Sequence, residues 1–207
     1  MKTFLFQGDS ITDADRQRER EDGYSFGLGY PNMVVGELSL KHPGEFRFFN
    51  KGVSGDRSTT VYDRMYTDIV NLKPDYMSIL IGVNDVWHGI SGNNGVSPDR
   101  YEQIMTMLYE DILKKLPDIK IIVLEPFVLK GTATEERWED FDTGVKTIAK
   151  KAKSLAEKFG FRFVPLQEKF DEVSKNTPTE WWLADGVHPA PAGHKLIADE
   201  LIKALDL

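Results

Sequence analysis

The chain of 207 residues is 41% hydrophobic and 29% charged, with a formal net charge of −7 at pH 7. These values are typical of one globular domain spanning residues 1–207, and they exclude a disordered chain. The acidic balance argues against nucleic acid or an anionic membrane as a partner and fits a small-molecule or oligosaccharide substrate. The chain has no cysteine, which excludes a disulfide scaffold, a thiolate nucleophile and a thiolate-bound metal.

The first residues, MKTFLFQ, begin a β-favouring run at once, without the basic and apolar regions of a signal peptide. No apolar stretch approaches the roughly 20 residues that a membrane-spanning helix needs. We therefore expect a soluble, cytoplasmic protein with no membrane partner.

Five short β-favouring runs alternate with segments in which apolar residues recur at helical spacing. The predicted strands are Thr3–Phe6, Phe46–Phe49, Tyr76–Ile81, Lys120–Leu124 and Phe161–Val164. The predicted helices are Asn32–Leu40, Thr59–Leu72, Pro98–Leu116, Arg137–Phe159 and Pro191–Leu205. This alternation predicts an α/β fold with a five-stranded parallel sheet covered by helices on both faces. The segment 89–98, GISGNNGVSP, is polar and glycine-rich and is predicted to be a loop inside the domain.

Three polar loops that contain glycine are predicted to follow the first three strands. Their sequences are GDSIT at 8–12, NKGVSGDRS at 50–58 and GVNDVWHG at 82–89. In open parallel sheets, ligands bind beyond the carboxyl ends of the strands. We therefore expect these loops to meet at one edge of the sheet and to bring serine, glycine and asparagine together there.

Ser10, in the first of these loops, is the predicted nucleophile of a hydrolase. Such a serine needs a general base, an acid that orients the base, and donors for the oxyanion. The segment ADGVHPAPAGH places Asp185 three residues before His188 in a stretch rich in glycine and proline. A turn there would let Asp185 hold one ring nitrogen of His188 while the other faces Ser10, in the chain order serine, aspartate, histidine.

The other histidines have less specific interpretations. His194 is expected to be structural, His88 to border the site and His42 to lie on the surface. A metal site made of Asp185, His188 and His194 lacks helical histidine spacing and a further ligand, so no metal or other cofactor is predicted.

A second serine lies in a motif that resembles a nucleophile elbow. The sequence GYSFG at 23–27 matches the Gly-x-Ser-x-Gly pattern, which has meaning only between a strand and a helix. Here it follows the charged run RQREREDG, so Ser25 is not predicted to be the nucleophile.

The blocks GDSIT, NKGVSG, GVND and DGVHP resemble, in order, the four sequence blocks of the SGNH (GDSL-type) hydrolases. The resemblance spans residues 8–188. It implies a three-layer α/β/α, flavodoxin-like sandwich and a triad of Ser10, His188 and Asp185. It also implies an oxyanion hole made of the Ser10 and Gly52 backbone N–H groups and the Asn84 side chain.

Longer stretches around these blocks resemble the intracellular acetylxylan esterases, which deacetylate xylo-oligosaccharides. This resemblance implies an acetylesterase for carbohydrate and a possible homo-oligomer. Asp9, Trp87 and Trp182 are the predicted substrate-binding residues. Loop aromatic residues suit stacking on sugar rings; they are Tyr24, Tyr30, Trp87, Trp181 and Trp182. Core or interface packing is the alternative for these side chains.

Two other functions remain open at this point. A lysophospholipase or acyl-thioesterase of the same fold would need an apolar trough for a long acyl chain. A receiver or other flavodoxin-like binding module would use Asp9 with Asp85. A receiver also needs a lysine at the end of the fifth strand, where this chain has valine, proline and leucine at 164–166.

Overall fold

A computed structural model describes residues 1–20 and 22–205. Its sheet has five parallel strands, in the order β2-β1-β3-β4-β5. The strands are β1 (Lys2–Gly8), β2 (Phe46–Asn50), β3 (Tyr76–Leu80), β4 (Lys120–Leu124) and β5 (Arg162–Val164). All five predicted strands are confirmed, with bounds that differ by one or two residues. The strand order is that of flavodoxin-like folds.

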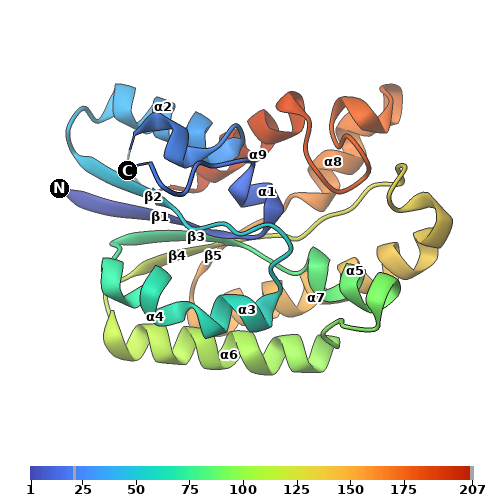
Figure 1. Ribbon diagram of the computed structural model, residues 1–207, viewed down its shortest axis with the longest axis horizontal. Helices are drawn as coiled ribbons and strands as arrows, with labels where there is room; N and C mark the ends of the chain where they lie inside the picture. Colours follow the sequence, from blue (N-terminus) through green and yellow to red (C-terminus); the bar gives the residue numbers. More distant parts are fainter. Residues whose placement is uncertain (21, 206–207) are drawn as a thin grey trace.

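Helices cover both faces of the sheet and give three layers (Figure 1). One face carries α1 (Ser10–Asp13), α2 (Tyr30–Lys41), α8 (Gln167–Val173) and α9 (Pro191–Ala204). The other face carries α3 (Ser58–Asp63), α4 (Met65–Asp68), α6 (Pro98–Lys115) and α7 (Trp138–Phe159). The α/β/α flavodoxin-like sandwich is therefore confirmed. Within the described part of the chain, no helix combines the length and apolar character needed to cross a bilayer.

Strand residues alternate between two hydrophobic cores, one on each face of the sheet. In β1, Phe4 and Phe6 pack in the core beneath α2 and α9, whereas Leu5 packs in the core above α6. Because both faces are buried, the strands are apolar almost throughout, which is why they were recognisable in the sequence. The sheet is thus a rigid base for the loops at its carboxyl edge.

The predicted helix Thr59–Leu72 is interrupted in the structure. It is divided into α3, α4 and a short 3₁₀ turn, η2 (Val70–Leu72). The break lies at Arg64, whose backbone adopts φ −91° and ψ 6°. The Arg64 side chain forms ion pairs with Asp56 and Asp68, on both sides of the break. These tertiary contacts override the helical periodicity, in which Val61, Met65 and Ile69 still face the core.

Three of the helices in the structure lie outside the predicted helical segments. They are α1, α5 (Val83–Gly92) and α8. Helix α5 replaces most of the predicted GVNDVWHG loop and the start of the GISGNNGVSP loop. Its apolar residues Val83, Val86, Trp87 and Ile90 recur at spacings of three and four, so the helical signal was present. Asn84 therefore lies in the first turn of a helix rather than in a flexible loop.

The strand order places a crevice between β1 and β3. Chain connections leave these neighbouring strands toward opposite faces, and such a switch point is where flavodoxin-like folds bind ligands. The residues that follow β1 are Asp9 and Ser10, and those that follow β3 include Gly82 and Asn84. The fold thus brings the GDSIT and GVND segments together, as predicted.

Gly82, at the turn from β3 into α5, tests this junction. Its φ of +141° suits glycine, and an added Cβ would lie 2.6 Å from Cγ2 of Ile148. We expect Gly82→Ala to lower the free energy of unfolding by about 1–3 kcal/mol in urea denaturation. The control is Gly36→Ala in α2, where no atom lies within 4 Å of the added Cβ. The free energy of unfolding of Gly36→Ala should rise by roughly 0.5–1 kcal/mol. Equal free energies of unfolding for the two variants would contradict this account.

Candidate active site

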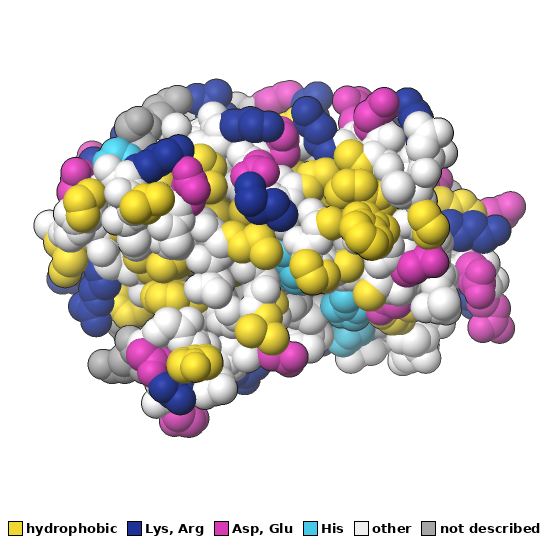
Figure 2. Space-filling model, turned by 90° about the horizontal axis from the view of Figure 1, so that it is seen from above, with side chains coloured by type: hydrophobic (Ala, Val, Ile, Leu, Met, Phe, Trp, Pro, Cys, Tyr) yellow, Lys and Arg dark blue, Asp and Glu magenta, His cyan; other side chains and the backbone are white. Residues whose placement is uncertain are grey.

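A pocket of about 680 Å³ lies at the carboxyl edge of the sheet. Ser10 and His188 both line it, together with side chains of the segment that follows α1. Figure 2 shows histidine side chains that reach the surface near the centre of the upper face, beside hydrophobic side chains. The structure thus joins the start of the chain to its carboxyl-terminal loop at a single pocket.

Ser10, His188 and Asp185 form a continuous chain of hydrogen bonds. Ser10 Oγ lies 3.0 Å from His188 Nε2, and His188 Nδ1 lies 2.7 Å from Asp185 Oδ2. The other carboxylate oxygen of Asp185 accepts from the backbone N–H groups of Val187 and His188 at 2.9 and 2.8 Å. This local loop fixes the carboxylate against the imidazole, as the spacing of three residues predicted.

The ionised carboxylate of Asp185 makes the imidazole of His188 more basic than a free one. Burial disfavours the Asp185 carboxylate, but hydrogen bonds from His188 and Val187 outweigh burial and lower its pKa to about 2. The hydrogen bond to Asp185 raises the pKa of His188 above 6.5, although partial burial opposes this shift. Asp185 therefore stays ionised at neutral pH and holds Nδ1–H, which leaves Nε2 as a proton acceptor toward Ser10.

The backbone N–H groups near Ser10 differ in whether they are already paired. Ser10 is the first residue of α1, a position whose N–H has no intrahelical acceptor. The Gly52 N–H, predicted to face an oxyanion, instead donates to Asn50 Oδ1 at 2.9 Å. The Gly55 N–H, three residues further on, has no acceptor among the residues that the structure describes. Gly55 has a φ of +83° and is partly exposed.

Gly52 has a clear packing role. A Cβ at this position would lie 2.4 Å from the backbone nitrogen of Asp13 in α1. Only glycine lets this loop lie directly against the helix that carries Ser10. The sequence contains two glycines in NKGVSGDRS, and residue type alone does not say which of them has a free N–H.

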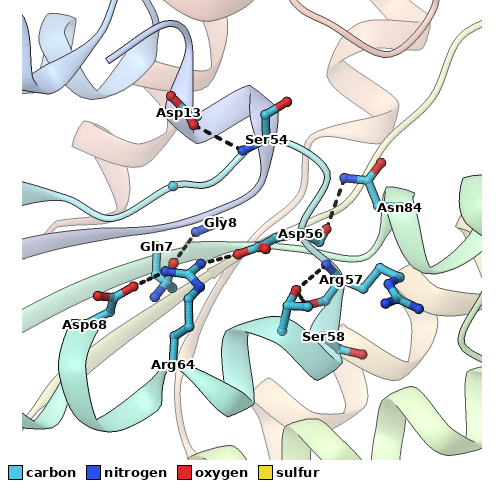
Figure 3. Close-up of polar contacts among 12 residues, drawn as sticks. Gln7, Gly8, Asp13, Ser54, Asp56, Arg57, Ser58, Arg64, Asp68 and Asn84 are labelled. Carbon is cyan, nitrogen blue, oxygen red and sulfur yellow. Dashed lines mark hydrogen bonds and ion pairs between the residues drawn. The ribbon is translucent and has the colours of Figure 1, made fainter. Parts of the chain in front are cut away.

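Asn84 is held by a network of polar residues that the sequence analysis did not identify (Figure 3). Its side-chain amide donates one hydrogen bond to the carbonyl of Asp56 at 3.0 Å, which leaves its second N–H free. Arg64 in turn pairs with the Asp56 carboxylate and with Asp68. The Asn84 amide is therefore fixed through Asp56 to the break between α3 and α4.

Asp85, next to Asn84, anchors the start of α5 to the start of α3. Its buried carboxylate accepts from the backbone N–H and the hydroxyl of Ser58. Burial raises the pKa of Asp85 to about 6, against the hydrogen bonds from Ser58. This carboxylate is bonded to Ser58 and does not line the pocket, so its role in the fold is to fix the position of Asn84.

Asp9, predicted to bind substrate, is almost fully buried beside Ser10. Its Oδ1 accepts from the Ile11 N–H at 3.0 Å and caps α1, so its contacts are internal. Burial raises the pKa of Asp9 to about 7, although the Ile11 N–H and the nearby His188 oppose this shift. The capped helix holds Ser10 at the base of the pocket.

The predicted aromatic residues occupy different environments. The Trp87 ring lies 5.8 Å from the ring of His188 and 5.6 Å from that of Phe141, centroid to centroid. Trp182 packs against the core, donates its indole N–H to Thr177 and does not line the pocket. Tyr30 is buried, whereas Tyr24 and Trp181 are 60% and 63% exposed. Of these rings, Trp87 is the one beside His188, although like Trp182 it is not among the residues that line the pocket.

His194 and Ser25 lie outside the hydrogen-bonded chain of Ser10, although His194 lines the same pocket as Ser10 and His188. His194 Nδ1 accepts from the Tyr30 N–H at 3.2 Å, and burial lowers its pKa to about 4. Ser25 lies in a 3₁₀ turn, η1 (Gly23–Phe26), and lines a different pocket. In the described residues, no three acidic or histidine side chains are grouped to hold a metal ion.

Comparison with known proteins identifies the family. Residues 6–196 match the model of the GDSL-like lipase/acylhydrolase family. An acetylxylan esterase of Geobacillus stearothermophilus is 34% identical over 206 residues, which cover 97% of this chain and 92% of that protein.

Solved structures agree with this match. The structure of the acetylxylan esterase from Geobacillus stearothermophilus superposes with a TM-score of 0.88 at 33% identity, covering 100% of this chain and 94% of that chain. A protein of Parabacteroides merdae described as a GDSL-like lipase gives a TM-score of 0.93 at 35% identity, covering 98% and 94% of the two chains. These similarities exclude the receiver alternative and confirm the resemblance seen in the sequence. The chain belongs to the GDSL-like lipase/acylhydrolase family and is a serine esterase.

Proposed function

We propose that this esterase removes O-acetyl groups from xylo-oligosaccharides, with Ser10 as nucleophile, His188 as general base and Asp185 as the residue that orients it. The observation that carries the proposal is the hydrogen-bonded chain from Ser10 through His188 to Asp185 at the pocket. The acetylxylan esterase relative supports the substrate class. Catalytic mutants of that relative replace a serine, an aspartate and a histidine, and the last two are three positions apart, as Asp185 and His188 are here.

The reaction follows from the geometry of these three residues. His188 Nε2 takes the proton of Ser10 Oγ while Oγ attacks the acetyl carbonyl carbon, which forms a tetrahedral intermediate. His188 then gives this proton to the sugar oxygen as the ester bond breaks, and Ser10 is left acetylated. Water, deprotonated by His188, attacks the acetyl group, and release of acetate returns the proton to Ser10.

We assign the oxyanion hole to the Ser10 N–H, the free N–H of Asn84 and the Gly55 N–H. The Gly55 assignment replaces the predicted Gly52, because the Gly52 N–H already donates to Asn50. Ser54 lines the pocket with Ser10, and Asp56 accepts from Asn84, so Gly55 lies on the chain segment between these two positions. Preorganised N–H donors of this kind stabilise the negative charge that develops on the carbonyl oxygen.

The lining of the pocket favours an acetyl group on a polar alcohol over a long acyl chain. The apolar side chains Ile11, Ala14, Leu28, Pro189 and Pro191 share the pocket with Arg16, Arg18 and two carboxylates, so a long acyl chain bound there would lie beside charged groups. Trp87, beside His188, offers an indole surface near the leaving group, where a sugar ring can stack. The same pocket would be unfavourable for the acyl chain of a lysophospholipase or long-chain thioester substrate.

Replacement of the two candidate serines tests the nucleophile. Ser10→Ala should reduce kcat by a factor on the order of 10⁶ while the protein remains folded, because the covalent step is lost. Ser25→Ala is the matched control, since Ser25 lies in a different pocket, and it should retain the activity of the parent. Both are measured with 4-nitrophenyl acetate and checked by circular dichroism; loss of activity in Ser25→Ala alone would reject Ser10 as nucleophile.

The pH dependence tests the base. Only neutral His188 can accept the serine proton, so kcat/KM should rise with pH through the pKa of His188. Asp185 raises that pKa, so the midpoint should lie above the ordinary value of about 6.5. Asp185→Asn removes the stabilisation of imidazolium and should shift the midpoint downward while lowering kcat by about 10⁴. An unchanged midpoint in Asp185→Asn would assign the titration to another group, such as the nearby Asp9.

Acyl chain length tests the substrate class. We expect kcat/KM to fall from acetyl to butyryl to octanoyl esters of 4-nitrophenol, and acetylated xylobiose to release acetate. Activity that rises with acyl length would favour the lipid esterase alternative. Trp87→Ala should weaken activity on acetylated xylobiose more than on 4-nitrophenyl acetate. An equal loss on both substrates would leave the acetylesterase assignment in place and remove the stacking role of Trp87.

A further inference from the structure

Arg16 lies in the same pocket as Ser10 and His188 but has no part in the chemistry described above. Two successive residues with left-handed backbone conformations, Ala14 (φ 42°) and Asp15 (φ 60°), turn the chain at the end of α1. After this turn the Arg16 Nε–H donates to the carbonyl of Gly52 at 2.8 Å. This bond ties the guanidinium to the loop beside the nucleophile and sets its orientation.

The remaining guanidinium donors of Arg16 are unused. Among the described residues, the two Nη groups have neither a hydrogen-bond acceptor nor a carboxylate partner. Burial lowers the pKa of Arg16, and its neighbours Arg18 and Arg64 add to this effect while Asp13 opposes it. A half-buried guanidinium with up to four free N–H donors is costly unless an acceptor satisfies it.

The charged groups around Arg16 do not neutralise it. Asp13 is engaged by Arg18 at 2.7 Å and by the Ser54 N–H at 3.1 Å. Asp15 is exposed at the mouth of the pocket and is not bonded to Arg16. A neighbouring pocket that shares Arg16 and Arg18 is also lined by Arg20, which pairs with Asp22, and by Arg47 and Lys51, which have no carboxylate partner among the described residues. This side of the active site is therefore cationic in a chain of net charge −7.

We propose that Arg16 binds a carboxylate on the sugar portion of the substrate, so that the esterase prefers acetylated xylo-oligosaccharides that carry a uronic acid substituent. This inference rests on the proposed function and makes it more specific. A carboxylate accepts two parallel hydrogen bonds from a guanidinium, which matches the free Nη donors. A neutral xylose hydroxyl would satisfy at most part of them. A phosphate monoester could use the same donors and is therefore a separate arm of the test.

Direct binding tests the site without depending on turnover. Ser10→Ala protein is titrated calorimetrically with three unacetylated ligands: neutral xylotriose, xylotriose with a glucuronic acid branch, and xylotriose phosphate. The uronate ligand should bind about 10- to 100-fold more tightly than the neutral ligand, and this preference should weaken as salt is added. Equal affinities would overturn the proposal, and tighter binding of the phosphate than of the uronate would overturn its assignment to carboxylate.

Variants at Arg16 then test whether this residue causes the preference for the uronate ligand over the neutral ligand. Arg16→Gln in the Ser10→Ala background should abolish it, and Arg16→Lys, which keeps the charge, should retain part of it. Arg100→Gln is the control, because Arg100 is exposed on α6, on the opposite face of the sheet, and the change in net charge is the same. A preference that survives Arg16→Gln, or that is lost equally in Arg100→Gln, would reject Arg16 as the binding residue.

Measurements of kcat/KM distinguish a role of Arg16 in substrate binding from a purely structural role. With Ser10 intact, Arg16→Gln should lower the ratio of kcat/KM for acetylated uronate-bearing over neutral xylotriose by about 10- to 100-fold. A fall in kcat by the same factor on both substrates, with the ratio unchanged, would show that Arg16 only supports the turn at Gly52. If the parent enzyme deacetylates neither sugar, the proposed function fails, whereas the binding results still decide whether the carboxylate site exists.

Discussion

The hydrogen bond between Ser10 and His188 joins residues 178 positions apart, and the rest of the active site depends on it. It forms only if the carboxyl-terminal loop docks against the first turn of the chain. Two further features support this docking: the Tyr30 N–H donates to His194, and Ile197 and Leu201 of α9 are fully buried in the core beside α2. The apolar packing of α9 therefore fixes the position of the loop that carries His188, and the short loop around Asp185 fixes the orientation of the His188 ring.

Buried carboxylates stiffen the base of the site. Asp9 caps α1 beneath Ser10, Asp56 pairs with Arg64, and Asp85 binds Ser58 behind Asn84. Each carboxylate accepts from a group on another part of the chain or from the start of its own helix, and these contacts offset part of the desolvation penalty that an unpaired charge would carry. The remaining penalty is visible in the raised pKa values of Asp9 and Asp85. Together they fix the Ser10 N–H and the Asn84 amide, two of the donors that we propose for the oxyanion hole, before a substrate arrives. Preorganisation of this kind is what makes oxyanion stabilisation effective.

Most of the fold could be predicted because its signals are local. Burial on both faces made the central strands apolar almost throughout, and residue type marks helix ends at Pro98, the first residue of α6, and at Gly160, the left-handed residue after α7. The positions of Ser10 and Asn84 beyond neighbouring strand ends followed from the parallel topology, whereas His188 lies in the loop before α9. What could not be predicted depends on contacts between distant residues. The helix break at Arg64 depends on the ion pair with Asp56. Whether Gly52 or Gly55 has a free N–H depends on Asn50, which accepts the Gly52 N–H.

The two walls of the pocket differ in how strongly they are constrained. Ser10, Asn84 and His188 are attached to the core through buried carboxylates and backbone bonds. Residues 14–20 and 22–28 are held by polar contacts such as the bonds from Arg16 Nε–H to the Gly52 carbonyl and from the Asn50 amide to the Phe26 carbonyl, and Leu28 is 74% exposed. Substitutions of exposed side chains there remove little buried area and cost little stability. Because Arg16 belongs to this wall and lines the pocket with Ser10, a change in the sugar contacts that we propose for Arg16 need not disturb the hydrogen-bonded chain of Ser10, His188 and Asp185.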